Sequence, residues 1–187
     1  MNFQNDTLKP IAENMTINCK GQLIDLSTPK VMGILNVTPN SFYDGGKFKS
    51  DSDILTQVEK MLTDGATFID LGAYSSKPNA EFVSEEQEIA RLIPIVNLIL
   101  ENFPNTFISI DTFRSKIAEL SIENGASIIN DISAGSLDEK MFEVIAKYNV
   151  PYIMMHMKGT PETMQSLTNY ENIVKEILFY FSEKVAK

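Results

Sequence analysis

The amino-acid sequence predicts an α/β fold assembled from repeated strand–helix units. Three observations support this prediction. Short apolar runs alternate with segments of helical periodicity, they recur about every 30 residues, and each run ends in a polar side chain. Strands that alternate with helices form parallel sheets through right-handed crossovers. A flavodoxin-like open sheet and a closed (βα)8 barrel both satisfy this pattern.

The first predicted element lies outside the repeat. Residues 15–29 place apolar side chains at alternating positions around Lys20-Gly21, which predicts a short β-hairpin. We therefore predict two parts, an N-terminal extension with a hairpin over residues 1–29 and a strand–helix domain over residues 30–187.

Five strand–helix units follow the hairpin. The predicted strands are Val31–Leu35, Ala66–Leu71, Thr106–Ile110, Ser127–Ile129 and Pro151–Met155. The predicted helices are Ser52–Asp64, Ser84–Leu100, Ser115–Glu123, Asp138–Lys147 and Tyr170–Lys187. The strands are nearly continuous apolar runs, which is typical of parallel strands that are buried on both faces.

The helices are predicted from side-chain spacing and from signals at their ends. Ile54 and Val58 lie four residues apart, on one face of the first helix. Ser84 and Gln87 have the Ser-x-x-Gln pattern of a capping box at the start of the second helix. Gly125 follows the third helix and acts as a stop signal.

The composition indicates a globular, acidic protein. The 187 residues are 43% hydrophobic and 22% charged, which excludes a disordered or collagen-like chain. The formal net charge is -9 and the sequence pI is about 4.6, so a polyanionic partner is repelled at long range. Arginine occurs only at Arg91 and Arg114. We therefore expect no nucleic-acid partner.

The chain shows no signal for export or membrane insertion. Its opening residues lack a basic segment followed by an apolar run. Its apolar stretches are far shorter than the ~20 residues that cross a bilayer. Cys19 is the single cysteine, so an intrachain disulfide cannot form, which fits a reducing compartment. We expect a cytoplasmic protein with no membrane partner.

The polar residues that end the apolar runs are the candidate ligand-binding residues. They are Asn36, Asp70, Asp111, Asn130 with Asp131, and His156. In a barrel or an open parallel sheet, the carboxyl ends of the strands share one mouth, where ligands bind. Each residue taken alone could instead cap the following helix or turn. Five such positions in register favour a ligand site.

Two long loops, over residues 37–47 and 73–80, follow the first two strands. Ser76 beside Lys77 can hold phosphate oxygens, and Asn36 can present a neutral oxygen to Mg2+. The sequence has no GxGxxG, GxxxxGKS/T or GxSxG motif, and its single histidine and single cysteine argue against zinc. The pattern therefore favours binding and charge stabilisation over a covalent intermediate.

Five segments resemble the signatures of the dihydropteroate synthase family, in the order that the family shows. They are Gly33–Phe42 with Asp44–Gly46, Asp70–Pro78, Ser109–Thr112, Ile129–Gly135 and Met155–Pro161. Together these segments are far more specific than any one of them. The resemblance runs from about Met15 to the end of the chain.

The resemblance implies a (βα)8 barrel of the TIM-barrel type, of which this chain carries the hairpin and about five of eight units. It implies an enzyme that condenses 6-hydroxymethyl-7,8-dihydropterin diphosphate with p-aminobenzoate. The implied products are 7,8-dihydropteroate and pyrophosphate, in folate biosynthesis. Mg2+ is the implied metal ion, and full-length members allow a homodimer.

The same resemblance implies roles for the residues that match the family motifs. Asn36 and Lys77 are implied as catalytic residues, and Asn36 also as a residue of the Mg2+–pyrophosphate site. Ser76, Asp111 and Asn130 are implied as substrate-binding residues, the last two on the pterin ring. Lys77 stands where the family usually has arginine.

Two other interpretations stay open on the sequence. One is a related pterin-binding methyltransferase domain, which binds a folate methyl donor and needs a corrinoid partner. The other is an inactive or truncated pterin-binding paralogue. The family's later pterin-binding Asp, the Lys of its seventh-strand motif and its Arg-x-His motif have no counterpart before Lys187. Because these site residues are absent, the 187-residue chain alone is expected to be inactive, also on the dihydropteroate synthase interpretation.

Overall fold

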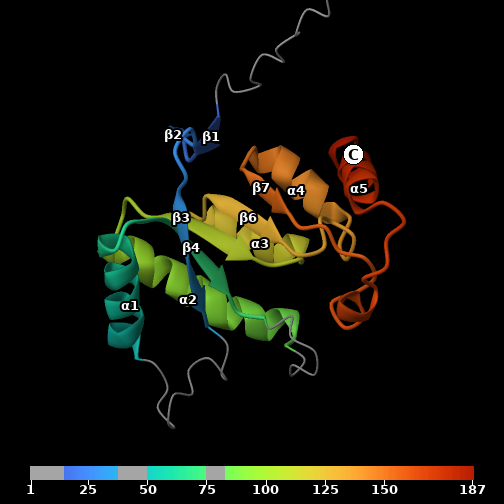
Figure 1. Cartoon of the computed structure of the whole chain (residues 1–187). Helices are drawn as coiled ribbons and strands as arrows, with labels where there is room; N and C mark the ends of the chain where they lie inside the picture. Colours follow the sequence, from blue (N-terminus) through green and yellow to red (C-terminus); the bar gives the residue numbers. More distant parts are fainter. Residues whose placement is uncertain (1–14, 38–49, 75–82) are drawn as a thin grey trace, which may run out of the picture.

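The structure is a computed structural model that describes residues 15–37, 50–74 and 83–187 (Figure 1). Its strands are β1 (Thr16–Cys19), β2 (Gln22–Asp25), β3 (Val31–Asn36), β4 (Ala66–Gly72), β5 (Phe107–Asp111), β6 (Ile128–Asp131) and β7 (Tyr152–Met154). Its helices are α1 (Asp51–Thr63), α2 (Glu85–Asn102), α3 (Ser115–Glu123), α4 (Lys140–Tyr148) and α5 (Ile173–Val185), with a short 3-10 helix η1 (Met164–Ser166) before α5. The predicted hairpin and all five predicted strand–helix units are present.

The strands β3 to β7 form one parallel sheet. Each strand pairs with the next along the chain, in the order β3-β4-β5-β6-β7. A flavodoxin-like sheet reverses its strand order at a switch point, whereas a (βα)8 barrel keeps the order of the sequence. The observed order therefore favours the barrel arrangement.

The strands β1 and β2 form the predicted antiparallel hairpin. Lys20 and Gly21 connect them with φ angles of 54° and 81°, the left-handed pair that a tight two-residue turn requires. The Asn18 Oδ1 atom accepts a hydrogen bond from the Gly21 N–H at 2.9 Å. Cys19 is buried in one cluster with Phe68 of β4. The hairpin therefore packs near the amino ends of the strands, and Figure 1 shows it beyond the start of β3.

The main core lies between the sheet and the helices. Leu35 of β3 and Ile110 of β5 are buried in one cluster with Val58 of α1. Because side chains alternate between the faces of a strand, Ile34 and Asn36 lie on the face opposite to Leu35. Ile34 is 65% exposed there. The expectation that the strands are buried on both faces is therefore wrong for this part of β3.

The ends of the helices match the prediction at α2 and differ from it at α4. Ser84 and Gln87 form the predicted capping box, with hydrogen bonds of 3.3 and 3.0 Å. α4 begins at Lys140 rather than at Asp138, because the Asp138 carboxylate accepts hydrogen bonds from the N–H groups of Ser115 and Lys140 at 2.8 and 3.1 Å. Within the described residues, no helix has the length and apolar character to cross a membrane.

Candidate functional site at the carboxyl ends of the strands

A row of four residues crosses the sheet at the carboxyl ends of its strands. In register they are Asn36, Gly72, Asp111 and Asn130, from β3, β4, β5 and β6. A Cβ atom built on Gly72 would lie 3.3 Å from Asp111 Oδ2 and 3.4 Å from Asn36 Oδ1. These two side chains therefore converge above Gly72, where a larger residue would crowd them. The structure thus brings together three residues that the sequence predicts for the site.

A second row lies one layer deeper on the same face. Ile34, Asp70 and Ser109 are partners in register across β3, β4 and β5. Ser109 Oγ donates a hydrogen bond to Asp70 Oδ1 at 2.6 Å. Asn130 Nδ2 donates one to Asp70 Oδ2 at 3.2 Å, which joins the two rows. We call the face of the sheet that carries these two rows the open face.

Asp111 is the carboxyl group of the open face whose pKa is shifted most clearly. Burial, followed by the negative charges of Asp70, Glu88 and Asp131, raises the pKa of Asp111 from 3.8 to about 7. In the described part of the chain, no group donates a hydrogen bond to this carboxyl group. A carboxyl group with a pKa near neutrality and open acceptor positions is a candidate for ligand binding.

Asp131 also ends a strand, but its side chain binds other groups of the protein and stabilises the fold. The Oδ1 atom accepts hydrogen bonds from the N–H and the hydroxyl group of Ser133, at 2.7 and 2.8 Å. The Oδ2 atom accepts them from the Gly135 N–H and the Tyr152 hydroxyl, at 2.8 and 2.6 Å. Asp131 is fully buried. The sequence pattern places Asp131 among the ligand-binding residues, and the structure shows the alternative, in which it holds the following turn.

His156, which follows β7, lies outside the row of strand ends. The partner of Asn130 on β7 is Ile153, three residues earlier in the chain. The imidazole ring packs against Tyr170 and Tyr180, with ring centroids 5.9 and 4.8 Å away. The prediction that His156 is one of the strand-end ligand-binding residues is therefore wrong, and His156 belongs to an aromatic cluster.

Sequence reasoning missed a buried ion pair beside the site. The Arg114 guanidinium forms an ion pair with Glu88 of α2, and Thr112 Oγ1 donates a hydrogen bond to Glu88 Oε1 at 2.9 Å. Arg114 Nη2 also donates to the Val83 carbonyl at 2.8 Å, and its guanidinium lies 5.4 Å from the Tyr74 ring centroid. Burial raises the pKa of Glu88, and the bonds from Thr112 and Arg114 oppose this rise.

A signal for this pair was present in the sequence. Glu88 precedes Leu92 by four residues and Val96 by eight, so it occupies the apolar stripe of α2. A glutamate at such a position needs a buried partner. Arg114 is one of only two arginines in the chain.

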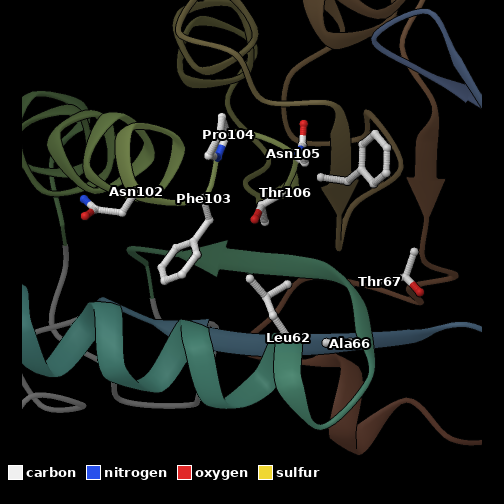
Figure 2. Close-up of a pocket in the computed structure, with 9 residues that line it drawn as sticks. Leu62, Ala66, Thr67, Asn102, Phe103, Pro104, Asn105 and Thr106 are labelled. Atoms are coloured by element: carbon white, nitrogen blue, oxygen red, sulfur yellow. The ribbon is translucent and has the colours of Figure 1, made fainter.

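A cavity of 410 Å³ lies at the other end of the sheet (Figure 2). Leu62 and Phe103, from the ends of α1 and α2, line it together with Thr67 and Phe107 at the starts of β4 and β5. The lining residues in the described part of the chain carry no ionisable side chain. The polar residues of the open face therefore form a site separate from this cavity.

Two predicted site residues, Ser76 and Lys77, lie outside the described residues, so their roles stay predictions. In the described part of the chain, no three His, Cys, Asp or Glu side chains gather as a metal centre. Asn36 nevertheless fits Mg2+, because its amide oxygen is a hard ligand and this ion commonly uses one or two protein oxygens together with phosphates and water.

The comparisons with known proteins identify the family. A family model described as "Pterin binding enzyme" matches residues 32–187, from β3 to the end of the chain. The chain belongs to the pterin-binding enzymes. This match covers both rows of the open face and confirms the family resemblance of the sequence.

Named relatives point to one activity within the pterin-binding enzymes. A dihydropteroate synthase of Escherichia coli is 42% identical over 173 residues, which are 92% of this chain and 61% of that protein. Across eight curated relatives that it matches, the chain spans from 20% to 61% of their length.

Solved structures confirm the barrel type. A dihydropteroate synthase of Yersinia pestis, solved as a sulfonamide drug complex, matches with a TM-score of 0.81 and 39% identity, over 92% of this chain and 62% of that one. A dihydropteroate synthase of Xanthomonas albilineans in complex with 7,8-dihydropteroate matches with a TM-score of 0.75 and 28% identity, over 91% of this chain and 58% of that one. The sheet of this pterin-binding enzyme is thus part of a TIM-type barrel, and the flavodoxin-like alternative is wrong.

Proposed function

We propose that the protein is a dihydropteroate synthase. It condenses 6-hydroxymethyl-7,8-dihydropterin diphosphate with p-aminobenzoate and releases pyrophosphate. The observation that carries the proposal is the row of Asn36, Gly72, Asp111 and Asn130 at the mouth of the strands. Relatives named dihydropteroate synthase favour this activity over methyl transfer to a corrinoid protein.

Asp111 and Asn130 are the residues that we assign to the pterin ring. The 2-amino-4-oxo edge of a pterin offers N–H donors, and a carboxylate and an amide oxygen are matching acceptors. Donors from the ring would favour the ionised form of Asp111 and give charge-assisted hydrogen bonds. The related Xanthomonas albilineans enzyme was solved with 7,8-dihydropteroate, the product proposed here.

Asn36 and Lys77 are assigned to the diphosphate side of the reaction. Asn36 would hold Mg2+ through its amide oxygen, while Ser76 and Lys77 would contact anionic groups or p-aminobenzoate. Mg2+, when bound, neutralises charge on the leaving pyrophosphate. The bond between the pterin methylene carbon and the diphosphate oxygen breaks, and the arylamine nitrogen bonds to that carbon and loses a proton. The residues of this chain orient the two substrates for that exchange.

We also propose a cytoplasmic location and a homodimer for this protein. Cys19 is a free, buried thiol, as a reducing compartment allows. Cell fractionation tests the location, and sedimentation of the purified protein tests the oligomeric state. A membrane-bound or monomeric protein would contradict these two proposals.

The direct test is the formation of 7,8-dihydropteroate and pyrophosphate by the purified protein from the two substrates and Mg2+. Asp111→Ala is expected to abolish pterin binding in calorimetry, because the ring loses a charge-assisted partner. Lys77→Ala is expected to retain pterin binding and to weaken the p-aminobenzoate or pyrophosphate step. Pterin binding without any product would identify a non-catalytic paralogue, and methyl transfer from a methylated folate would identify the methyltransferase.

A further inference from the structure

Asp70 lies in the middle of the sheet, where an acidic side chain is costly. It is only 6% exposed, and its neighbours in register are Ile34 and Ser109. A buried carboxylate is tolerated when its oxygens accept hydrogen bonds. The reaction proposed above gives Asp70 no contact with a substrate, so its presence needs another explanation.

Both carboxylate oxygens of Asp70 bind protein donors. Ser109, which is fully buried, donates through its hydroxyl group to Oδ1 at 2.6 Å. Asn130 donates through Nδ2 to Oδ2 at 3.2 Å. The bond from Ser109 satisfies one oxygen of the carboxylate. The other oxygen selects the nitrogen end of the Asn130 amide by itself, since a carboxylate only accepts hydrogen bonds.

The orientation of Asn130 follows from this bond. The amide group is planar, so tying Nδ2 to Asp70 turns Oδ1 away from it. No donor among the described residues occupies this Oδ1 atom. The neighbouring residue in the row, Asp111, also receives no hydrogen bond from the described part of the chain. The open face therefore presents two adjacent side chains as acceptors.

We propose that Asp70 is a positioning residue that fixes the Asn130 amide with its oxygen toward the ligand, and thereby selects pteridines with an amino group at position 2. This inference deepens the proposed function and rests on it for the identity of the ligand. A 2-amino group donates hydrogen bonds, whereas the 2-oxo group of a 2,4-dioxo pteridine accepts them. With Asn130 reversed, the site would offer an NH2 group instead and lose this preference.

The orientation itself can be tested without any ligand. In the wild-type protein, NMR should show one Asn130 side-chain amide proton that exchanges slowly, in contrast to the amide of the exposed Asn105. In Asp70→Asn, the new side chain has a single acceptor oxygen for the Ser109 and Asn130 donors. We therefore expect the Asn130 side-chain amide proton to exchange faster than in the wild type. An Asn130 amide that exchanges as fast as Asn105 in the wild type overturns the inference, even where the variant does not fold.

The selectivity is tested by calorimetry with 6-hydroxymethylpterin and its 2,4-dioxo counterpart. Wild-type protein should prefer the 2-amino compound, and Asp70→Asn should weaken its binding about tenfold and reduce the preference. Ser109→Ala is the matched control, because it removes one bond to Asp70 but leaves the Asn130 contact. We expect its preference to stay within about twofold of wild type.

A double variant, Asp70→Asn with Asn130→Asp, reverses the direction of the bond and still leaves an oxygen facing the ligand. It should recover part of the lost affinity for 6-hydroxymethylpterin, which a merely structural role of Asp70 does not predict. An unchanged preference in Asp70→Asn overturns the inference while the proposed function stands. Wild-type protein that binds no pterin overturns the proposed function, and the NMR measurement still decides the Asp70–Asn130 bond.

Discussion

Asp111 and Asp131 end neighbouring strands, and their carboxyl groups have opposite surroundings. Asp131 accepts four hydrogen bonds, from Ser133, Gly135 and Tyr152. Asp111 accepts none from the described residues, and burial with nearby negative charges raises its pKa to about 7. A carboxylate whose acceptor positions are filled by the protein supports the fold, whereas one with open positions is available to a ligand.

The difference follows from the alternation of side chains along the strands. Asp111 is in register with Asn130, so both side chains lie on the open face. Asp131 is the next residue after Asn130, so its side chain points to the other face. Ala134 and Gly135, with φ angles of 47° and 73°, then turn the chain so that the Gly135 N–H reaches Asp131. The face of the sheet on which a side chain lies, which alternation along the strand sets, is thus a better guide to function than its position at a strand end.

The largest expected effect concerns Asp131. Asp131→Ala leaves three buried donors and the partly buried Tyr152 hydroxyl without an acceptor. We expect it to lower the free energy of unfolding by about 4 kcal/mol. Urea denaturation followed by circular dichroism measures this loss. Asp131→Asn, which keeps one acceptor oxygen and the side-chain shape, is the control and should lose less. A change below about 1 kcal/mol in Asp131→Ala would contradict its structural role.

Glu88 extends the comparison to a buried carboxylate that is satisfied by a cation. Arg114→Met removes the cation and leaves Glu88 uncompensated, so we expect a loss of about 3 kcal/mol in the free energy of unfolding. The double variant with Glu88→Met should recover part of this loss, because a well-packed apolar pair replaces the ions. Lys147→Met, which breaks an exposed ion pair, should cost less than about 1 kcal/mol. Equal losses of unfolding free energy in Arg114→Met and Lys147→Met would mean that Arg114 does not compensate the buried Glu88 carboxylate.

Asp111→Asn is expected to stabilise the protein at the expense of binding. The pKa of Asp111 lies near 7 in the folded protein, above the ordinary value of 3.8, so the folded state holds this proton more tightly than the unfolded chain. The stability that this group contributes is therefore present in full below about pH 4 and is lost as the pH rises through about 7. At pH values above about 8, we expect the variant to be more stable than wild type by about 2 kcal/mol.

Urea titrations at about pH 4, 6 and 8 test this expectation through the difference between variant and wild type. The difference should grow with pH, and binding of 6-hydroxymethylpterin should fall at least about tenfold. A stability difference that stays constant over this range would show that the pKa of Asp111 in the folded protein does not lie near 7. Retained pterin binding would remove Asp111 from the ligand site.

The smallest expected effect tests one of the four bonds to Asp131. Tyr152→Phe removes the hydroxyl donor and keeps the ring, whose centroid lies 6.1 Å from that of Phe142. Because the lost bond is to a charged acceptor, we expect a cost of about 1.5 kcal/mol in the free energy of unfolding. Tyr148→Phe is the matched control, since its hydroxyl bonds to the exposed Glu123 and should cost less. Equal costs at the two tyrosines would mean that Asp131 does not depend on this donor.

Much of the fold could be predicted because its signals are local. The Lys20-Gly21 turn, the Ser84 capping box and the five apolar runs depend on neighbours a few residues away, and the structure confirms each of them. The start of α4 could not be predicted, because the Asp138 side chain binds the Ser115 N–H, 23 residues earlier. Whether the sheet is open or part of a barrel also depends on strand order, which apolar patterning leaves undetermined.

The sequence by itself determined which residue types stand at the strand ends, and thereby named Asn36, Asp111 and Asn130. Only the tertiary structure decided which strand-end residues face the ligand site and which support the fold. The register across β3 to β6 places these three side chains on the same face of the sheet as Gly72. Because side chains alternate along β6, Asp131 lies on the opposite face. The same packing supplied Asp70 as the partner of Asn130, 60 residues away. The physical reason is that a hydrogen bond between distant strands is set by their pairing, which no local pattern encodes.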